Sequence, residues 1–353
     1  MNIFFDMRWT RVDTIDGLSR YGSSLAAALH KLHPITVIIF DKRQLRLLPK
    51  DVPYVVVNHP FSPRELFLPL RLNKLGADVV FSPLQTMGTW GRKYKLILTL
   101  QDLIYYEHPQ PPTFLPLPVR IIWRLFHLSY WPQRLLLNQA DEVATVSKTS
   151  KKYIEEHHLT KRRVHVVYNA PLELEEPPKR TKEPTRNILY MGSFMPYKNA
   201  ELLIAGMKDL PEYTLHLLSK ISPERKAELE KLVPKGAKVT FWNGISEQDY
   251  QNLLVNAWAL ASASRSEGFG LPLIEAMALG VPVTCSNTEI FREVGGNAAL
   301  YFSSDSPQEF AQKIRQLEDT TTRKQAINKG KLQAAKFRWQ HSAQTLLDIM
   351  TKM

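Results

Sequence analysis

The sequence predicts an α/β protein built from two doubly wound domains, and three observations lead to this prediction. The chain has 353 residues, which exceeds the roughly 250 residues at which a single hydrophobic core usually stops growing. Short apolar, β-branched runs alternate with segments of helical spacing, as in parallel sheets covered by helices on both faces. A proline- and charge-rich stretch, residues 172–187, interrupts this alternation, which then starts again. We therefore expect two domains that face each other across a ligand-binding cleft at the carboxyl ends of their strands.

The first domain is expected over residues 1–171. Its helices are predicted over residues 17–32, from the spacing of apolar residues, and over the apolar and aromatic segment 116–139. Its strands are predicted over 2–7, 35–41, 54–59, 78–83, 95–102, 142–147 and 164–169.

The second domain is expected over residues 188–335, after a linker at 172–187. A long helical segment over 306–350 is predicted to be broken near Lys336 and Phe337, so that residues 336–353 form a C-terminal helix able to cross back to the first domain. The strands of this domain are predicted over 188–193, 214–219, 239–244, 259–264, 282–287 and 299–303.

Composition excludes several classes of protein. A single cysteine, Cys285, excludes a disulfide framework and a thiolate zinc site. The first residues carry Asp6 and no long apolar run, so no signal peptide is predicted, and no stretch approaches the roughly 18 apolar residues of a membrane span. We expect a cytoplasmic protein that can attach peripherally to the inner face of the membrane.

The net charge of +12 is concentrated in the first half of the chain. Residues 1–172 hold 23 Lys and Arg against 13 Asp and Glu, whereas residues 173–353 hold 23 against 21. This charge favours a polyanion or an anionic membrane surface, although surface lysines also serve solubility alone. No nucleic-acid-binding motif accompanies the charge, so nucleic acid is not an expected partner.

The segment 116–138 mixes aromatic residues with arginines. Arg120, Trp123 and Arg124 are the residues that we expect to contact a membrane surface or an acceptor, because aromatic side chains beside cations suit a membrane interface. The alternative is a core helix of the first domain with an arginine face.

Residues 266–283, SEGFGLPLIEAMALGVPV, predict a ligand-binding turn between a strand and a helix. Pro272 is suited to the first position of the helix, where its missing N–H costs nothing. Gly268 and Gly270 let the backbone approach a ligand, and the free amides of a helix start bind phosphate.

Two glutamates flank this turn. Glu267 lies on the loop and Glu275 about one turn into the helix, so both can accept hydrogen bonds from hydroxyls at opposite ends of one ligand. For Glu275 the alternative is an acid that only stabilises the helix dipole.

A dinucleotide-dependent dehydrogenase is not supported, because the glycine fingerprint G-x-G-x-x-G is missing. No such run follows the first predicted strand, Gly192 stands alone after its strand, and the third glycine is absent after Gly268 and Gly270.

The pattern S-x-x-E-G-F-G-L-P-x-x-E-A-M-A-x-G-x-P-V resembles the signature of retaining glycosyltransferases of family 4. This group includes phosphatidylinositol mannosyltransferases and many O-antigen and capsule mannosyltransferases. The resemblance covers nearly the whole chain and implies the GT-B fold, two facing Rossmann-like domains with a cleft between them. Further similar segments are DGLSRY (16–21), TLQDL (99–103), VATVSKTS (143–150), VVYNAP (166–171) and YMGSFMPYKN (190–199).

The resemblance implies a role for each matching residue. Glu275 would hold the ribose hydroxyls of a nucleotide-sugar, Glu267 would grip the donor sugar, and Lys198 would neutralise the diphosphate. The expected catalytic set is Gln101, Asp102, Lys198 and Glu267. The expected donor-binding set is Gly17 (through nearby amides), Ser193, Lys198, Ile245 (near the base), Glu267, Gly268, Phe269, Gly270, Leu271 and Glu275.

Two residues depart from the family pattern. Ser193 stands where an arginine often follows the phosphate-loop glycine, so one diphosphate contact is lost or supplied elsewhere. Gln101 stands where a histidine usually precedes Asp-Leu. Glutamine forms hydrogen bonds but does not titrate near neutral pH, which argues against a general base here. It is compatible with transfer in which the departing phosphate takes the acceptor proton, and also with altered sugar choice or weak activity.

The implied function is a retaining, metal-independent hexosyltransferase of cell-envelope polysaccharide or glycolipid synthesis. No Asp-x-Asp motif is present, and neither a metal nor another cofactor is expected. The favoured donor is GDP-mannose, with UDP-glucose next, and the acceptor is a glycan or a lipid-linked molecule. The alternative is a catalytically weak nucleotide-sugar-binding partner of another glycosyltransferase.

Overall fold

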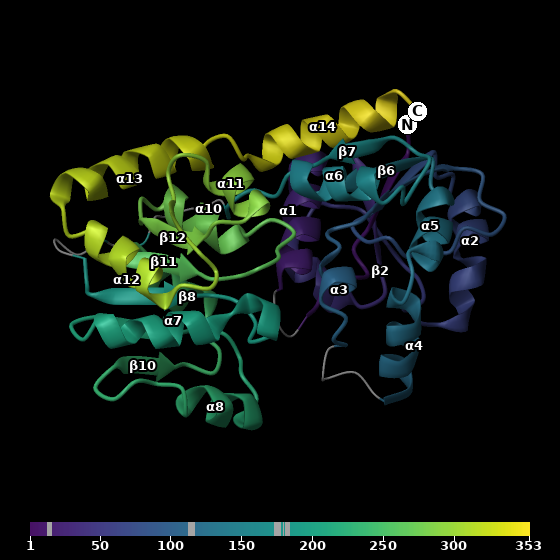
Figure 1. Cartoon of the computed structure of the whole chain (residues 1–353). Helices are drawn as coiled ribbons and strands as arrows, with labels where there is room; N and C mark the ends of the chain where they lie inside the picture. The colour runs from purple at the N-terminus through teal and green to yellow at the C-terminus, as the bar shows by residue number, and fades with distance from the viewer. Residues whose placement is uncertain (13–15, 112–116, 173–177, 179, 181–183) are drawn as a thin grey trace. The chain divides into compact units, whose positions relative to one another are not determined.

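The computed structural model describes residues 1–12, 16–111, 117–172, 178, 180 and 184–353 (Figure 1). These residues form two compact units. Unit 1 comprises residues 1–169 and 337–353, and unit 2 comprises residues 170–336. Most of the predicted linker 172–187 lies outside the described residues.

Unit 1 contains a seven-stranded parallel sheet in the order β3-β2-β1-β4-β5-β6-β7. The register pairs Ile3 with Ile35 on one side and with Val79 on the other. All seven predicted strands are confirmed, although several end two or three residues earlier than predicted because their last residues belong to loops. The strands are β1 (Ile3–Asp6), β2 (Ile35–Ile39), β3 (Tyr54–Val56), β4 (Val79–Ser82), β5 (Lys95–Thr99), β6 (Glu142–Thr145) and β7 (Val164–Val166).

Helix α1 (Gly17–Leu32) has the predicted bounds. Asp16 caps it by accepting a hydrogen bond from the backbone N–H of Ser19 at 2.8 Å, and Tyr21, Leu25 and Leu29 form its buried stripe. The C-terminal helix α14 packs against α1. The other helices of unit 1 are η1 (Lys42–Leu47), η2 (Pro63–Phe67), α2 (Leu68–Lys74), α3 (Ile104–Glu107), α4 (Leu117–His127), α5 (Trp131–Asn138), α6 (Lys148–Glu156) and α14 (Trp339–Thr351).

The prediction of one helical segment over 116–139 was wrong, because the described part forms two helices, α4 and α5. The break falls at Leu128–Tyr130, just before Pro132 in the first turn of α5. In a continuous helix Pro132 could not donate a hydrogen bond to the Leu128 carbonyl, and its ring would clash with that carbonyl.

Unit 2 contains a six-stranded parallel sheet in the order β10-β9-β8-β11-β12-β13. All six predicted strands are confirmed. They are β8 (Asn187–Tyr190), β9 (Thr214–Leu217), β10 (Lys238–Phe241), β11 (Ala259–Ser262), β12 (Val283–Ser286) and β13 (Leu300–Phe302).

Helices cover the sheet of unit 2. The predicted break near Lys336 is confirmed, but the segment 306–350 contains a second break at Leu317–Asp319, where Asp319 caps a new helix. The helices of unit 2 are η3 (Pro196–Lys198), α7 (Ala200–Gly206), η4 (Met207–Asp209), α8 (Pro223–Glu230), α9 (Glu247–Val255), α10 (Leu271–Ala278), α11 (Glu289–Gly295), α12 (Pro307–Gln316) and α13 (Thr320–Ala334).

The strand order places one switch point in each sheet. In unit 1 the connections run in opposite directions from β1 and β4, and in unit 2 from β8 and β11. Loops that leave the carboxyl ends of two such strands diverge and leave a crevice, where ligands of doubly wound domains bind. We therefore expect the candidate site residues to lie near these two switch points.

Candidate functional site

The switch point of unit 2 brings Lys198 and Glu267 together. Lys198 belongs to the loop after β8 and Glu267 to the loop after β11. The Lys198 Nζ lies 2.7 Å from Glu267 Oε1, and the two side chains are 14% and 15% exposed. The pair is thus partly withdrawn from water but reachable, as a group that meets a ligand must be.

Backbone contacts fix both loops. The Arg265 N–H donates to the Tyr197 carbonyl at 2.8 Å, which ties the residue before Lys198 to the loop that carries Glu267. Asn199 adopts left-handed backbone, with φ of 55°, and its side-chain amide donates to the Ser304 carbonyl at 2.8 Å. Asparagine tolerates this conformation better than most residues, so it suits the end of η3 and the start of α7.

The glycine turn leads directly into α10. Gly270 has φ of 99°, and a Cβ atom there would lie 2.9 Å from the Phe291 ring, so both the backbone and the space require glycine. Phe269 is buried and anchors the turn, whereas Gly268 is partly exposed. The helix begins at Leu271, one residue before the predicted first position of Pro272. Pro272 has no N–H and the Leu273 N–H donates to the Gly270 carbonyl at 3.0 Å, so it is the Leu271 amide at this helix start that can meet an anion.

Glu275 is the fifth residue of α10 and is half-buried. The Tyr250 hydroxyl of α9 donates to Glu275 Oε2 at 3.1 Å, and Tyr250 is 2% exposed. Ile245 lies half-buried just before α9, after Gly244 with φ of 102°. Tyr250 was not predicted as a site residue, because no local pattern joins residues 25 positions apart.

Ser193 is exposed, and its carbonyl accepts a hydrogen bond from the Tyr190 hydroxyl at 2.5 Å. Arg225, a cation that was not predicted, bonds the residue after Ser193: its Nε donates to the Phe194 carbonyl at 3.0 Å. Arg225 also forms ion pairs with Glu201 and Glu228, which occupy its charge in this structure.

Gln101 and Asp102 follow β5 in unit 1. Gln101 Nε2 donates to the carbonyl of Pro83, just after β4, at 2.9 Å, and the backbone carbonyl of Gln101 accepts from the Ser150 hydroxyl at 3.3 Å. Asp102 Oδ1 accepts from the Ile104 N–H at 3.1 Å, at the start of α3. The Gln101 side chain is thereby held beside the switch point of unit 1. Gly17 is exposed at the start of α1, and residues 13–15 before it lie outside the described residues.

A buried ion cluster at the carboxyl end of β1 was also missed. Arg8, 2% exposed, forms paired hydrogen bonds with Asp6 and with Glu65, and its fifth N–H donates to the Asn58 carbonyl. Burial alone would lower the pKa of Arg8, but the carboxylates of Asp6 and Glu65 raise it well above its usual value. Burial would raise the pKa of Glu65, but the Arg8 guanidinium holds it below its usual value. Every side-chain N–H of Arg8 thus has an acceptor, so the cluster has a structural role: it links the end of β1 to Asn58 and Glu65.

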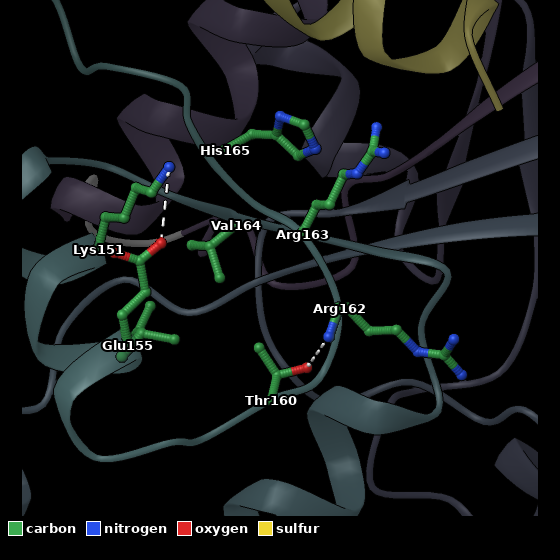
Figure 2. Close-up of a pocket in the computed structure, with 8 residues that line it drawn as sticks. Lys151, Glu155, Thr160, Arg162, Arg163, Val164 and His165 are labelled. Carbon is green, nitrogen blue, oxygen red and sulfur yellow. Dashed lines mark hydrogen bonds and ion pairs between the residues drawn. The ribbon is translucent and has the colours of Figure 1, made fainter.

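A pocket of about 300 Å³ in unit 1 lies elsewhere, between α6 and the start of β7 (Figure 2). Figure 2 shows Arg162 and Arg163 directed away from Glu155. Lys151 pairs with Glu155 at 3.7 Å, and His165 contacts Glu142 at 2.8 Å. The pocket opens at the amino end of its strand, so it does not have the position of a ligand site in a doubly wound domain.

The expected membrane residues Arg120, Trp123 and Arg124 lie on α4, of which no residue is buried. The alternative of a core helix is therefore wrong. Trp123 is half-buried, with its ring centroid 5.0 Å from that of Tyr105 and 4.1 Å from that of His127, so it faces the protein. Arg124 is exposed and Arg120 half-exposed.

The described ranges contain neither a membrane-spanning helix nor a cluster of metal ligands. Among the helices in those ranges, none has both the length and the apolar character needed to cross a bilayer. Within the same residues, no three His, Cys, Asp or Glu side chains come together as metal ligands.

Two family models match the chain. The model "Glycosyl transferases group 1" covers residues 173–333, and "Glycosyltransferase Family 4" covers residues 15–170. Among relatives, the O-antigen chain mannosyltransferase RfbU of Salmonella typhimurium is 29% identical over 52% of this chain and 53% of its own length. The O-antigen chain mannosyltransferase B of Escherichia coli is 33% identical over 43% and 42%. The matched region thus spans about half the length of these curated relatives.

Solved structures resemble the whole chain. The structure of Anabaena HepE in complex with UDP and glucose has a TM-score of 0.74 at 18% identity and covers 100% of both chains. That of WaaG, a glycosyltransferase involved in lipopolysaccharide biosynthesis, has a TM-score of 0.69 at 16% identity and covers 99% of both. With two parallel sheets, matches to the GT-B fold over its full length and family models over both halves, the chain belongs to glycosyltransferase family 4.

Proposed function

We propose that this chain is a retaining, metal-independent glycosyltransferase that moves a hexose, with mannose favoured, from a nucleotide-sugar to a glycan or lipid-linked acceptor of the cell envelope. Unit 2 binds the donor and the basic unit 1 binds the acceptor. The protein works in the cytoplasm, at the inner face of the membrane.

The observation that carries the proposal is the pair of Lys198 and Glu267 at the switch point of unit 2, beside the start of α10. A diphosphate at this helix start meets the Leu271 amide and the Lys198 ammonium, which stabilise the negative charge that grows as the diphosphate departs. Glu267, next to the same ammonium, accepts hydrogen bonds from hydroxyls of the sugar attached to that diphosphate.

Glu275 has a different task. It lies one turn further along α10 and is held by the Tyr250 hydroxyl, so one carboxylate oxygen is oriented while the group can still accept from the ribose hydroxyls. Ile245, just before α9, supports the base. Each part of the donor thus has its own contact: the base with Ile245, the ribose with Glu275, the diphosphate with Lys198 and the sugar with Glu267.

The proton of the acceptor goes to the leaving group. In retaining transfer the bond between the anomeric carbon and the diphosphate oxygen breaks, and the acceptor oxygen forms its bond on the same face of the sugar. Gln101 cannot take the acceptor proton near neutral pH. The departing diphosphate oxygen, held by Lys198, therefore takes it, while Gln101 and Asp102 serve as hydrogen-bonding groups.

GDP-mannose is the favoured donor, because the relatives RfbU and mannosyltransferase B are described as mannosyltransferases. UDP-glucose is the next candidate, and a HepE structure holds that compound. A thermal-shift panel of GDP-, UDP-, ADP- and dTDP-sugars tests this choice. Stabilisation by a UDP-sugar at concentrations where GDP-mannose has no effect would reverse it.

The reaction itself is tested by donor hydrolysis and transfer with the purified chain. Glu267→Ala should retain binding of the bare nucleotide and lose turnover of the whole donor, since its contacts are to the sugar. A chain that binds a nucleotide-sugar but neither hydrolyses nor transfers it, with any acceptor extract, would instead be the binding partner of another glycosyltransferase.

A further inference from the structure

Helix α4 has two opposite apolar faces. At 100° per residue, Trp123, Phe126 and His127 share one side, and this side packs against the rings of Tyr105 and Tyr106. The His127 ring also contacts the Trp123 carbonyl at 2.8 Å. Burial lowers the pKa of His127, in keeping with a face turned toward the protein.

The other side, which we call the outer face, consists of Ile121, Ile122, Leu125 and Leu128, the last in the turn that follows α4. Ile122 is 66% exposed, Leu125 60% and Leu128 77%. Figure 1 shows α4 at the lower margin of unit 1, below α5. Four large aliphatic side chains on one exposed stripe are unusual for a surface that meets only water.

Within the segment 117–138, which carries the outer face, the charges have one sign; the neighbouring acid Glu107 of α3 lies near Tyr130, between α4 and α5. Arg120 and Arg124 are one turn apart and form one border of the stripe. The segment 117–138 contains a third arginine, Arg134, and no Asp or Glu. Arg134 is exposed on α5 and donates to the carbonyls of His157 and His158 at 2.9 and 3.1 Å. Trp131, 63% exposed, extends the apolar surface to the start of α5.

We infer that the outer face of α4 docks on an anionic lipid surface, with its four aliphatic side chains below the headgroups and Arg120 and Arg124 among the phosphates. An aliphatic stripe bordered by arginines and without acids matches a bilayer interface, where acyl chains and negative headgroups lie side by side. The inference deepens the proposed function and rests on it only for the statement that the acceptor is lipid-linked. Trp123 was expected to contact the membrane, but its ring packs against Tyr105 and His127, so we assign it to holding α4 in place.

The two kinds of contact differ in their response to salt. Each arginine near an anionic surface strengthens binding by about fivefold, so loss of both should weaken it by about 30-fold at low salt. This contribution should fade above about 0.5 M salt, where charges are screened within a few ångströms. The aliphatic contribution should persist.

Co-sedimentation of the full chain with phosphatidylglycerol–phosphatidylcholine vesicles tests the inference. Ile121→Glu with Leu125→Glu should weaken binding by about 100-fold or more at any salt concentration, because carboxylates would enter the interface. The matched control is Leu332→Glu on α13, also an exposed leucine. For Arg120→Gln with Arg124→Gln, the control is Lys324→Gln with Lys329→Gln, which removes the same charge from exposed positions of α13.

A second measurement does not depend on loss of binding. The single natural cysteine, Cys285, is buried, so Leu125→Cys offers one reactive thiol for an environment-sensitive fluorophore. Its emission should shift to the blue with anionic vesicles and be quenched by spin-labelled lipid, whereas the same label at Leu332→Cys should not respond.

Three outcomes would overturn the inference: no vesicle binding at low salt, equal binding by the wild type and the double glutamate variant, or an unresponsive label at position 125. A self-associated wild type that the glutamates dissociate, without vesicle binding, would make the outer face a contact between copies of this chain. The proposed function is tested separately, because nucleotide-sugar binding by unit 2 should be unchanged in the Ile121 and Leu125 variants.

Discussion

The two units share one architecture but differ in what they expose. Both have a parallel sheet with its first strand at the switch point. Among the described residues, seventeen of the twenty-one exposed large hydrophobic side chains belong to unit 1 and four to unit 2. Most of the net positive charge also lies in residues 1–172, because the two parts have equal numbers of Lys and Arg but residues 1–172 have fewer Asp and Glu. Unit 2 thus exposes few large apolar side chains, whereas unit 1 has the exposed apolar and basic surface on which the proposed lipid docking rests.

The charged side chains at the two switch points also differ in their exposure. In unit 1 the charges nearest the end of β1, Asp6 and Arg8, are buried and bonded to each other. In unit 2 the charges at the corresponding place, Lys198 and Glu267, remain partly exposed. We infer that the buried charges of Asp6 and Arg8 hold the loops of unit 1 together, whereas the partly exposed charges of Lys198 and Glu267 in unit 2 can contact a ligand.

The largest expected effect concerns the buried cluster. Arg8→Ala leaves the Asp6 and Glu65 carboxylates without their partner and should lower the free energy of unfolding by about 3–5 kcal/mol, measured by urea denaturation. The control is Arg315→Ala in unit 2, where an exposed pair with Glu212 should contribute no more than about 1 kcal/mol. If both variants lost the same free energy of unfolding, the buried ion cluster of unit 1 would contribute no more to stability than an exposed ion pair of unit 2.

The same cluster gives a pH dependence. The folded-state pKa of Glu65 is lowered, so its contribution to stability is full above its unfolded-state pKa, about 4.3, and is lost as the pH falls through the folded-state pKa. The free energy of unfolding of the wild type should therefore fall more steeply below about pH 4 than that of Glu65→Gln.

The next effect concerns the available charge of unit 2. Lys198→Ala should lower kcat by about 100- to 1000-fold, because it removes a cation that acts on charge developing in the transition state. Lys208→Ala, at an exposed position in η4, is the matched control and should be neutral. A Lys198 variant with altered nucleotide affinity and normal kcat would assign this lysine to ground-state binding instead.

Local patterns in the sequence predicted the strands of both units and the turn at the candidate site. All thirteen strands were predictable: most are buried and form short continuous apolar runs, and the exposed edge strands β3 and β10 still contain β-branched and aromatic residues. The turn before α10 was also predictable, since glycines, proline and both glutamates fall within ten residues. Contacts between distant residues could not be read from any local pattern: Glu65 lies 57 positions from Arg8, and Tyr250 lies 25 from Glu275.

A smaller effect distinguishes Glu275, which we expect to bind the ribose, from Tyr250, which orients Glu275. Glu275→Ala should weaken binding of the bare nucleotide by about 10- to 100-fold, measured by titration calorimetry, because the ribose contacts exist in the ground state. Tyr250→Phe removes only the hydroxyl that orients Glu275, worth about one hydrogen bond, and should weaken binding by about fivefold. In the double variant the loss should not exceed that of Glu275→Ala, since Tyr250 acts through Glu275. Additive losses would mean that Tyr250 contacts the nucleotide directly.

The smallest expected effect is at Gln101, where unit 1 contributes a neutral group. Its Nε2 donates to the Pro83 carbonyl, which leaves the second N–H and the amide oxygen able to meet a sugar hydroxyl. Gln101→Ala should lower kcat by about tenfold, as expected for one or two lost hydrogen bonds. Gln101→His, which restores the common family residue, should change kcat by less than about threefold and add a dependence on pH near 6–7 that the wild type lacks. If the histidine variant were far more active than the natural chain, Gln101 would mark a decayed site. Unit 1 would then lack a working group of its own, and the chain would fit the nucleotide-sugar-binding partner better than the enzyme.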